Sequence, residues 1–273
     1  MPITNNLTEQ DIQRLSDTLV SARKAQRALN EFPQPVPDTL EQAYQIQDLS
    51  MADYQDELVG WKVGVVPEHL REQYRAERLM GPIYKGLCHF LKAAHTNGEV
   101  LEVPIFAKGF AAVEAELIFE VAEDIAPGSV DTSAELTHLV KNVYAGIEIA
   151  SSPVPDLNNY GPAAIISDFG NNNGMIVGAA IDNWQQTIAN IQTQVWIDDK
   201  LINQAPANAV LNGPMAAFSY LIECCAEREI SLKRGALICT GAITGVHEAK
   251  AGSCSTVDFG LAGQLNIKLT DFC

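Results

Sequence analysis

The chain has 273 residues, of which 47% are hydrophobic, and its formal net charge is -16. This acidic charge excludes nucleic acid and anionic membranes as principal partners, because both require a basic surface. The start, "MPITNNLTEQDIQ", lacks the basic and apolar regions of a secretory signal, and no apolar run reaches the roughly 20 residues that span a bilayer. We therefore expect a cytoplasmic protein.

The cysteines and histidines form no metal-binding motif. The six cysteines contain no CxxC pattern, and the five histidines are scattered along the chain. This spacing predicts neither a disulfide framework nor a zinc cluster. An acidic substrate would be repelled by the net charge, so it would need a local cation, either a metal ion or a desolvated lysine.

The N-terminal part predicts two helices. Thr8 and Asp11 resemble a capping box, and apolar residues follow at helical spacing towards Phe32. The segment "PQPVP" at 33–37 ends this helix, and Asp38 is expected to cap a second one. We assign residues 1–56 to an N-terminal helical segment.

From residue 58 onwards, short apolar runs alternate with glycine, proline and asparagine, a pattern typical of strands. The predicted strands lie at about 58–66, 111–121, 143–150, 174–180, 191–197, 236–239 and 264–269. A helix is expected over Gly213–Glu229. The prediction is an α+β protein in which residues 57–273 form a β-rich catalytic body, joined to the N-terminal segment in one structural unit.

The stretch "AAVEAELIFE" places Glu114 and Glu116 two residues apart in an apolar strand. Residues i and i+2 of a strand point to the same face, so the two carboxylates share one face. One interpretation is a half-buried strand whose polar face lies in water. The other is a pair of oxygen ligands for a hard cation.

Two other strands carry a lone charge. Glu148 is the only charge in "VYAGIEIA", and Lys62 is the only charge in "LVGWKVGVV". A buried Glu148–Lys62 ion pair is one explanation, although such a pair adds little stability compared with apolar residues. Because three carboxylates would face one lysine, a bound divalent cation is the alternative.

Two further segments are candidates for the site. Asp168 follows an apolar run in "AAIISDFGNNNG", where it either opens a turn or holds Lys62 or a water. The asparagines after it are typical turn residues. The glycines of "CTGAITG" (239–245) indicate either a close approach of the backbone to another group or a bulge.

An ordered set of motifs carries a family resemblance. These motifs are "GWKVG", "GPIYKGL", "EAELIF", "AGIEI" and "GALICTGAITG". In this order they resemble the fumarylacetoacetate hydrolase superfamily, in its 2-keto-4-pentenoate hydratase and 2-oxo-acid decarboxylase branch. The resemblance extends from about Leu58 to Leu269. It implies a β-rich roll with helices around it, and a homo-oligomer.

The resemblance also implies a site. The family's Glu-x-Glu falls on Glu114 and Glu116 and its later glutamate on Glu148, so these residues would hold Mg²⁺ or Mn²⁺. Its glycine-aromatic-lysine element falls on Lys62, which would act as an acid–base or enolate-stabilising group. The implied function is a lyase of aromatic catabolism that hydrates 2-hydroxypenta-2,4-dienoate-like acids to 4-hydroxy-2-oxo acids. A 2-oxo-acid decarboxylase of the same branch is the alternative.

The chain departs from the family pattern at three positions, Val66, Ala150 and Phe169, where polar residues are usual. Loss of such polar contacts should shift the preference towards a less polar acid. A silent partner subunit, in complex with a pathway partner enzyme, is therefore another alternative. The segment at 67–80 predicts a charged surface helix, on which His69 could activate water in an acylpyruvate-type hydrolase.

Overall fold

The computed structural model describes residues 7–91 and 99–272. The helices are α1 (Glu9–Lys24), α2 (Leu40–Asp53), α3 (Glu68–Tyr74), α4 (Pro162–Ser167), α5 (Trp184–Thr187) and α6 (Pro214–Glu227). The strands are β1 (Leu58–Val65), β2 (Arg78–Tyr84), β3 (Cys88–Phe90), β4 (Val100–Ile105), β5 (Phe110–Val121), β6 (Val140–Ser152), β7 (Asn172–Ala180), β8 (Gln192–Ile197), β9 (Lys200–Pro206), β10 (Leu237–Cys239), β11 (His247–Glu248), β12 (Cys254–Asp258) and β13 (Gln264–Asp271).

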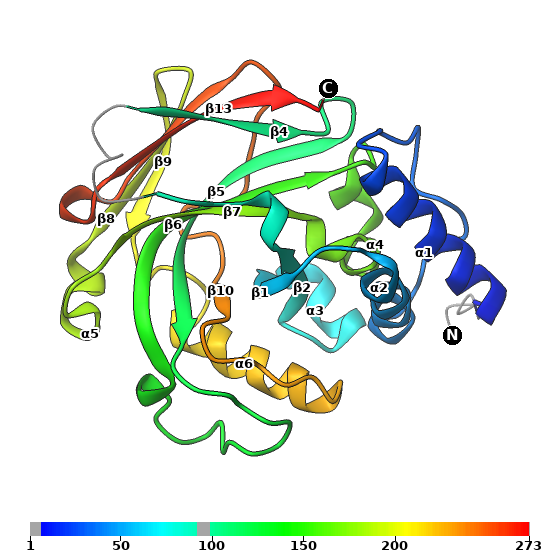
Figure 1. Cartoon of the computed structure of the whole chain (residues 1–273), viewed down its shortest axis with the longest axis horizontal. Coiled ribbons are helices and arrows are strands. Elements are labelled where there is room, and N and C mark those ends of the chain that lie inside the picture. Colours follow the sequence, from blue (N-terminus) through cyan, green and yellow to red (C-terminus); the bar gives the residue numbers. More distant parts are fainter. Residues whose placement is uncertain (1–6, 92–98, 273) are drawn as a thin grey trace.

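Two sheets form the body of the molecule (Figure 1). The larger sheet has the strand order β2-β1-β10-β5-β6-β7-β3, with β11 pairing to β5, and the smaller sheet has the order β4-β13-β12-β8-β9. Helices α1, α2 and α4 lie together at one end of the larger sheet, and α6 runs below it in Figure 1. The predicted α+β class with an N-terminal helical segment is confirmed.

The main core lies on one face of the larger sheet. Alternate residues of β5, including Val113, Ala115 and Leu117, are fully buried there. They pack with Phe218 of α6 and with Val257 of the smaller sheet. The apolar side chains of the larger sheet, the smaller sheet and α6 are thus buried against one another. This burial holds the two sheets and α6 together.

The opposite face of the larger sheet carries two smaller apolar clusters. One joins Ala112 of β5 to Leu15 and Leu19 of α1 and to Phe32. The other contains Ile118 and Cys239 together with residues of β2 and β7. Glu114 and Glu116 lie on β5 between the residues that this strand contributes to the two clusters, so apolar packing flanks them on both sides along the strand.

The N-terminal helices form, but their bounds differ from the prediction. The capping box of Thr8 and Asp11 is present at the start of α1. This helix ends at Lys24 and does not continue towards Phe32, because Gln26 adopts a positive φ of 51° that turns the chain back. The N-cap of α2 is Thr39, whose hydroxyl accepts a hydrogen bond from a backbone N–H of the first turn, and not Asp38.

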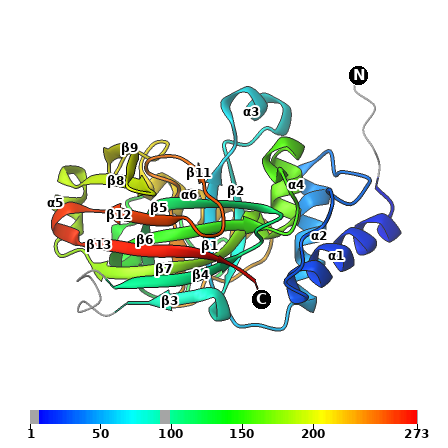
Figure 2. The ribbon, with the colours of Figure 1, turned by 90° about the horizontal axis from the view of Figure 1, so that it is seen from above.

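The charged surface helix predicted at 67–80 is present, but it is shorter than predicted. Only α3 is helical, and Arg75 after it adopts a left-handed φ of 51°. The chain then enters β2, whose residues are all buried and which pairs with β1. In Figure 2, α3 projects from the body next to α4. Within the described ranges, none of the helices has both the length and the apolar character needed to cross a membrane.

Candidate metal centre and adjoining cavity

Strand β5 directs Glu114 and Glu116 away from the main core, onto the face that carries the two smaller clusters. Their side chains are nevertheless buried, with 5% and 0% of their surface exposed. A polar strand face in water is therefore not the explanation for these glutamates. A buried carboxylate without a counter-charge is costly, so both residues require partners.

Glu148 of β6 lies directly opposite Glu114 in the antiparallel pair and is fully buried. Its Oε1 lies 3.3 Å from Nζ of Lys62 on β1 and accepts a hydrogen bond of 3.1 Å from Nδ2 of Asn172. Its Oε2 has no hydrogen-bond partner among the described residues. The ion pair that was one of the two explanations drawn from the sequence is present, but it leaves one oxygen of this carboxylate without a partner among the described residues.

The carboxylate of Glu116 likewise has a hydrogen-bond partner for only one of its two oxygens. Its Oε2 accepts a hydrogen bond of 2.8 Å from the backbone N–H of Gly241, in the loop after β10. Its Oε1 is buried and has no partner in the described part of the chain. The glycines at 239–245 thus allow the backbone to approach Glu116 closely, which is one of the two explanations that the sequence offered for them. Two buried carboxylate oxygens remain free, which is the donor chemistry that a divalent cation requires.

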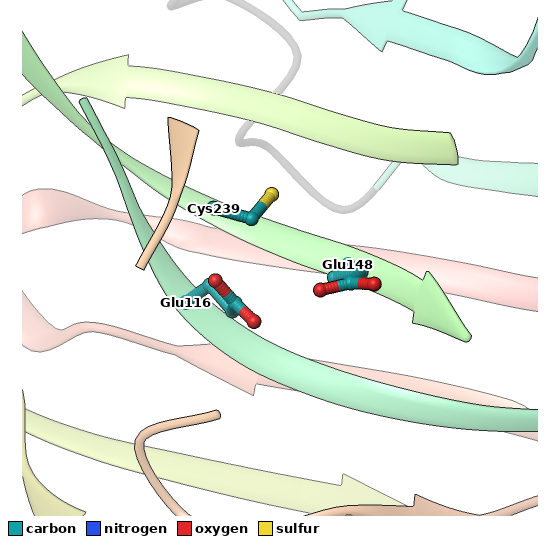
Figure 3. Close-up of side chains that lie close together, drawn as sticks. All are labelled: Glu116, Glu148 and Cys239. Atoms are coloured by element: carbon teal, nitrogen blue, oxygen red, sulfur yellow. The ribbon is translucent and has the colours of Figure 1, made fainter. Parts of the chain in front are cut away.

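A third donor atom lies beside these carboxylates. Ligand atoms of Glu116, Glu148 and Cys239 all lie within 4.8 Å of one another, and all three residues are fully buried. Figure 3 shows the three side chains on neighbouring strands. Glu114 is outside this group, so the structure brings together two of the three glutamates that the sequence predicted as ligands.

Electrostatics shows why the centre favours a cation. Burial raises the pKa of Glu114 to about 7, although Lys62 acts in the opposite direction. Burial and the charges of Glu148 and Glu114 raise the pKa of Glu116 well above its ordinary value. Burial lowers the pKa of Lys62, but the glutamates outweigh it and leave that pKa raised. One lysine does not balance the charge of three buried carboxylates, whereas the lysine and a divalent ion together would.

A cavity of about 340 Å³ adjoins this centre. Among the described residues, Lys62 and Glu114 are the charged ones that line it. Most of its other side chains are apolar, and they include Val65, Leu70, Leu79, Ile165 and Val246. A small organic acid fits a site of this kind, in which a few polar groups fix the orientation and apolar walls surround the rest.

Glycines leave room for the lysine that faces this cavity. A Cβ on Gly170 would lie 3.0 Å from Cδ of Lys62, and one on Gly64 would lie 3.4 Å from its Nζ. Gly170 also has a positive φ of 66°, which side-chain-bearing residues rarely adopt. Asn171 follows it in the cavity wall, where its buried Oδ1 has no partner among the described residues.

Asp168 does not contact Lys62. Its carboxylate accepts hydrogen bonds of 2.6 Å and 2.8 Å from Nε and Nη2 of Arg23, which comes from the last turn of α1. Arg23 also donates to the backbone carbonyls of Asn172 and Ser151, at 2.9 Å and 3.2 Å. Asp168 thus belongs to a buried ion pair behind the site, and its side chain does not hold the lysine.

His69 lies on the surface of α3. Its neighbours Pro67 and Leu70 line the cavity, but His69 is not among the lining residues. The structure therefore brings α3 to the mouth of the cavity without directing this imidazole into it. A water-activating histidine would need to reach hydrogen-bonding distance of the reacting water, directly or through a second water.

Sequence reasoning missed Arg23, Asn172 and Cys239. Arg23 resembles an ordinary basic residue in the last turn of a helix, where cations are common. Asn172 is one of three consecutive asparagines, which are typical of a turn. Cys239 stands alone, with no ligand spacing around it. Only the sheet register, which pairs Cys239 with Lys62 and with Ile118, shows that it shares their face.

Comparison with known proteins gives matches only at the level of structure. No family model matches the chain, and no curated protein sequence does. The 4-oxalocrotonate decarboxylase from Pseudomonas putida G7 aligns over 97% of this chain and 99% of its own, at 17% identity. Its complexes with calcium and acetate and with magnesium and adipate give TM-scores of 0.77 and 0.78.

Two further enzymes align over less of the chain. The fumarylpyruvate hydrolase from Pseudomonas aeruginosa, in complex with Mn²⁺ and pyruvate, covers 81% of this chain and 93% of its own, with 15% identity and a TM-score of 0.56. The 2-hydroxyhepta-2,4-diene-1,7-dioate isomerase from Mycobacterium marinum covers 79% and 77%, with 13% identity and a TM-score of 0.55. The chain therefore has the fold of these enzymes, which agrees with the fold that its family resemblance implied.

Proposed function

We propose that this protein is a divalent-metal-dependent lyase that hydrates a small monocarboxylic 2-hydroxy-2,4-dienoate, such as 2-hydroxypenta-2,4-dienoate, to a 4-hydroxy-2-oxo acid. The observation that carries this proposal is a pair of buried carboxylates, Glu116 and Glu148, each with one free oxygen, beside Lys62 at the wall of a cavity. Proteins with this fold have been crystallised with calcium, magnesium and Mn²⁺.

The residues present fit a divalent ion. The free oxygens of Glu116 and Glu148 would hold it. Glu114, which the resemblance implied as a third ligand, lies outside their group and lines the cavity. Mg²⁺ or Mn²⁺ would supply Lewis-acid stabilisation for the enolate of a 2-oxo acid. The ion would also offset the negative field of the chain at the point where an acid binds.

The protein's own groups have separate tasks. Lys62 holds a proton on Nζ at the cavity wall, next to Glu148, where it can stabilise developing enolate charge or move a proton. Asn171 offers an unpartnered amide oxygen, Oδ1, which can accept a hydrogen bond from the 2-hydroxyl group of the dienol. The apolar side chains exclude bulk water from most of the cavity, which strengthens the polar contacts that remain.

The cavity favours a single carboxylate on the substrate. Lys62 is the one cation among the described lining residues, and it is already engaged by Glu148. A second carboxylate at the far end of the substrate would meet Val65, Leu79 or Val246, without a counter-charge. A monoacid fits this environment, in line with the less polar substrate expected from the sequence.

Decarboxylation of a 2-oxo acid is the second candidate. It is supported by the likeness to the 4-oxalocrotonate decarboxylase, which includes the N-terminal helices and covers 97% of the chain. The acylpyruvate-type hydrolase with His69 has less support, because His69 is exposed and does not line the cavity.

Turnover of two acids separates these activities. Metal-stripped protein is incubated with 2-hydroxypenta-2,4-dienoate, with and without Mg²⁺, while dienol absorbance is followed and products are identified. We expect Mg²⁺-dependent formation of 4-hydroxy-2-oxopentanoate, and none with Lys62→Ala. Release of carbon dioxide from a 2-oxo diacid, without hydration of the dienol, would favour the decarboxylase. No turnover of either acid, by protein that binds metal, would contradict the proposal and favour a silent partner subunit.

A further inference from the structure

The candidate ligand group contains a sulfur atom. Cys239 ends β10, where it is paired in parallel with Lys62 of β1 and antiparallel with Ile118 of β5. Paired residues on neighbouring strands point to the same face of a sheet. This register therefore places the thiol on the face that also carries Glu116, and its Sγ lies within 4.8 Å of ligand oxygens of both Glu116 and Glu148.

Each residue of this group has an atom that could bind a ligand. One oxygen of Glu116 is taken by the N–H of Gly241, and one oxygen of Glu148 by Lys62 and Asn172. The second oxygen of each glutamate has no partner among the described residues. The Cys239 thiol makes a weak contact of 3.9 Å with Sδ of Met175. Two carboxylate oxygens and one thiol thus remain available to a ligand.

The distances suit a transition-metal ion. Zinc binds carboxylate oxygen at about 2.0–2.2 Å and thiolate sulfur at about 2.3 Å in a tetrahedral arrangement, so neighbouring donors are roughly 3.5 Å apart. Donor atoms that lie within 4.8 Å of one another reach this geometry when the side chains move together by up to about 1 Å. Magnesium, in contrast, prefers oxygen ligands and keeps several waters.

We infer that Cys239 is a ligand of the metal centre and that it shifts the preference of this centre from Mg²⁺ towards ions that accept thiolate, such as Zn²⁺, Co²⁺ and Fe²⁺. This inference rests on the proposed metal centre and adds a statement about which ion it selects. Thiolate ligands favour these softer ions, whereas an all-carboxylate site favours hard ones. The simplest competing role for Cys239 is packing in the apolar cluster with Ile83, Ile118 and Met175.

Cobalt reports thiolate ligation directly. One equivalent of Co²⁺ is added to metal-stripped, reduced protein, and the near-ultraviolet charge-transfer band from thiolate to cobalt is recorded. We expect the band in the wild type and its loss in Cys239→Ser, which keeps nearly the same shape. Cys254→Ser, at an exposed position on β12, and Cys88→Ser, at a partly buried position on β3, should keep it. Cys239→Ala provides a second variant should the serine protein fail to fold.

Competition between ions gives an independent measurement. The ratio of Co²⁺ affinity to Mg²⁺ affinity should fall by at least about tenfold in Cys239→Ser. Absence of the band from wild-type protein that binds Co²⁺, or an unchanged affinity ratio, would overturn the inference and leave the proposed function standing. Failure of the wild type to bind any divalent ion would contradict both. Turnover of the dienol is not needed for any of these measurements.

Discussion

At the scale of single residues, the centre is defined by unequal numbers of opposite charges. Glu114, Glu116 and Glu148 are buried around one lysine, and two of their oxygens lack partners in the described part of the chain. Buried polar groups are normally hydrogen-bonded, so these two oxygens require an explanation, and a bound divalent ion supplies one. Because negative charges outnumber positive ones, the stability and turnover of each variant should depend on whether a divalent ion is present.

Replacing Lys62 with methionine should abolish turnover and destabilise the metal-free protein. The change leaves buried carboxylates without their cation, which typically costs about 3–5 kcal/mol. Saturating Mg²⁺ or Mn²⁺ should restore part of this loss, as thermal denaturation with and without metal would show. Lys85→Met, which breaks an exposed ion pair with Glu57, is the control and should change neither property. Wild-type turnover by Lys62→Met would rule out the role proposed for this residue.

A cation placed at the mouth of the cavity should change substrate preference. Val246 lines the cavity and is 50% exposed, so Val246→Arg is compatible with the fold. We expect the preference for a 2-oxo diacid over a monoacid of equal length to rise by roughly tenfold, measured as a ratio of kcat/KM values. Val246→Gln controls for size. A wild-type enzyme that already prefers the diacid would contradict the proposed monoacid preference.

At the scale of elements, the N-terminal helix is tied to the back of the site. Arg23 of α1 binds both oxygens of Asp168 and the carbonyl of Asn172, whose side chain in turn donates to Glu148. Its guanidinium also lies 5.2 Å from the ring centre of Phe169. One side chain therefore connects α1, the α4–β7 segment and a candidate ligand.

Substitution of Arg23 should affect both stability and metal binding. Arg23→Met leaves Asp168 buried and unpaired, at a typical cost of about 3–5 kcal/mol in the free energy of unfolding. Metal affinity should also fall, because the backbone carbonyl of Asn172 loses its hydrogen bond from Arg23. Chemical denaturation measures the effect on stability, and metal titration measures the effect on affinity. The double variant Arg23→Met/Asp168→Asn should recover part of the stability.

Arg14 on the same helix is the matched control. It is half exposed and pairs with Asp11 near the protein surface, so Arg14→Met should leave stability and metal affinity close to those of the wild type. Equal effects of the Arg14 and Arg23 variants would show that α1 has no special connection to the centre.

At the scale of the whole molecule, stability should depend on pH and metal together. The folded-state pKa of Glu114, raised to about 7, exceeds its ordinary value of 4.5. Its contribution to stability is therefore fully present below about pH 4.5 and is lost as the pH rises through 7. The gain in melting temperature on adding Mg²⁺ should thus increase from pH 5 to pH 8. A gain that is constant or decreases over this range would contradict the placement of the carboxylates around an ion.

Much of the architecture could be predicted because local patterns determine it. The alternation in "AAVEAELIFE" and the lone charges in "LVGWKVGVV" and "VYAGIEIA" are enough to identify Glu114, Glu116, Lys62 and Glu148 from the sequence alone. Strand β2 was not predicted from the sequence. The charged residues directly before it continue the helical pattern of the preceding segment, so the start of the strand was assigned to that helix. The partner of Asp168 was not predicted because Arg23 is 145 positions away in the sequence, and such contacts depend on tertiary packing.

The central claim is that Glu116 and Glu148 hold a divalent ion that binds a 2-oxo acid. The most direct test is titration of metal-stripped protein with Mn²⁺, with free ion followed by electron paramagnetic resonance, in the presence and absence of pyruvate. We predict one tightly bound ion per chain, tighter binding with pyruvate because the two affinities are linked, and loss of this site in Glu116→Gln/Glu148→Gln. Equal Mn²⁺ binding by the wild type and this double variant would contradict the claim.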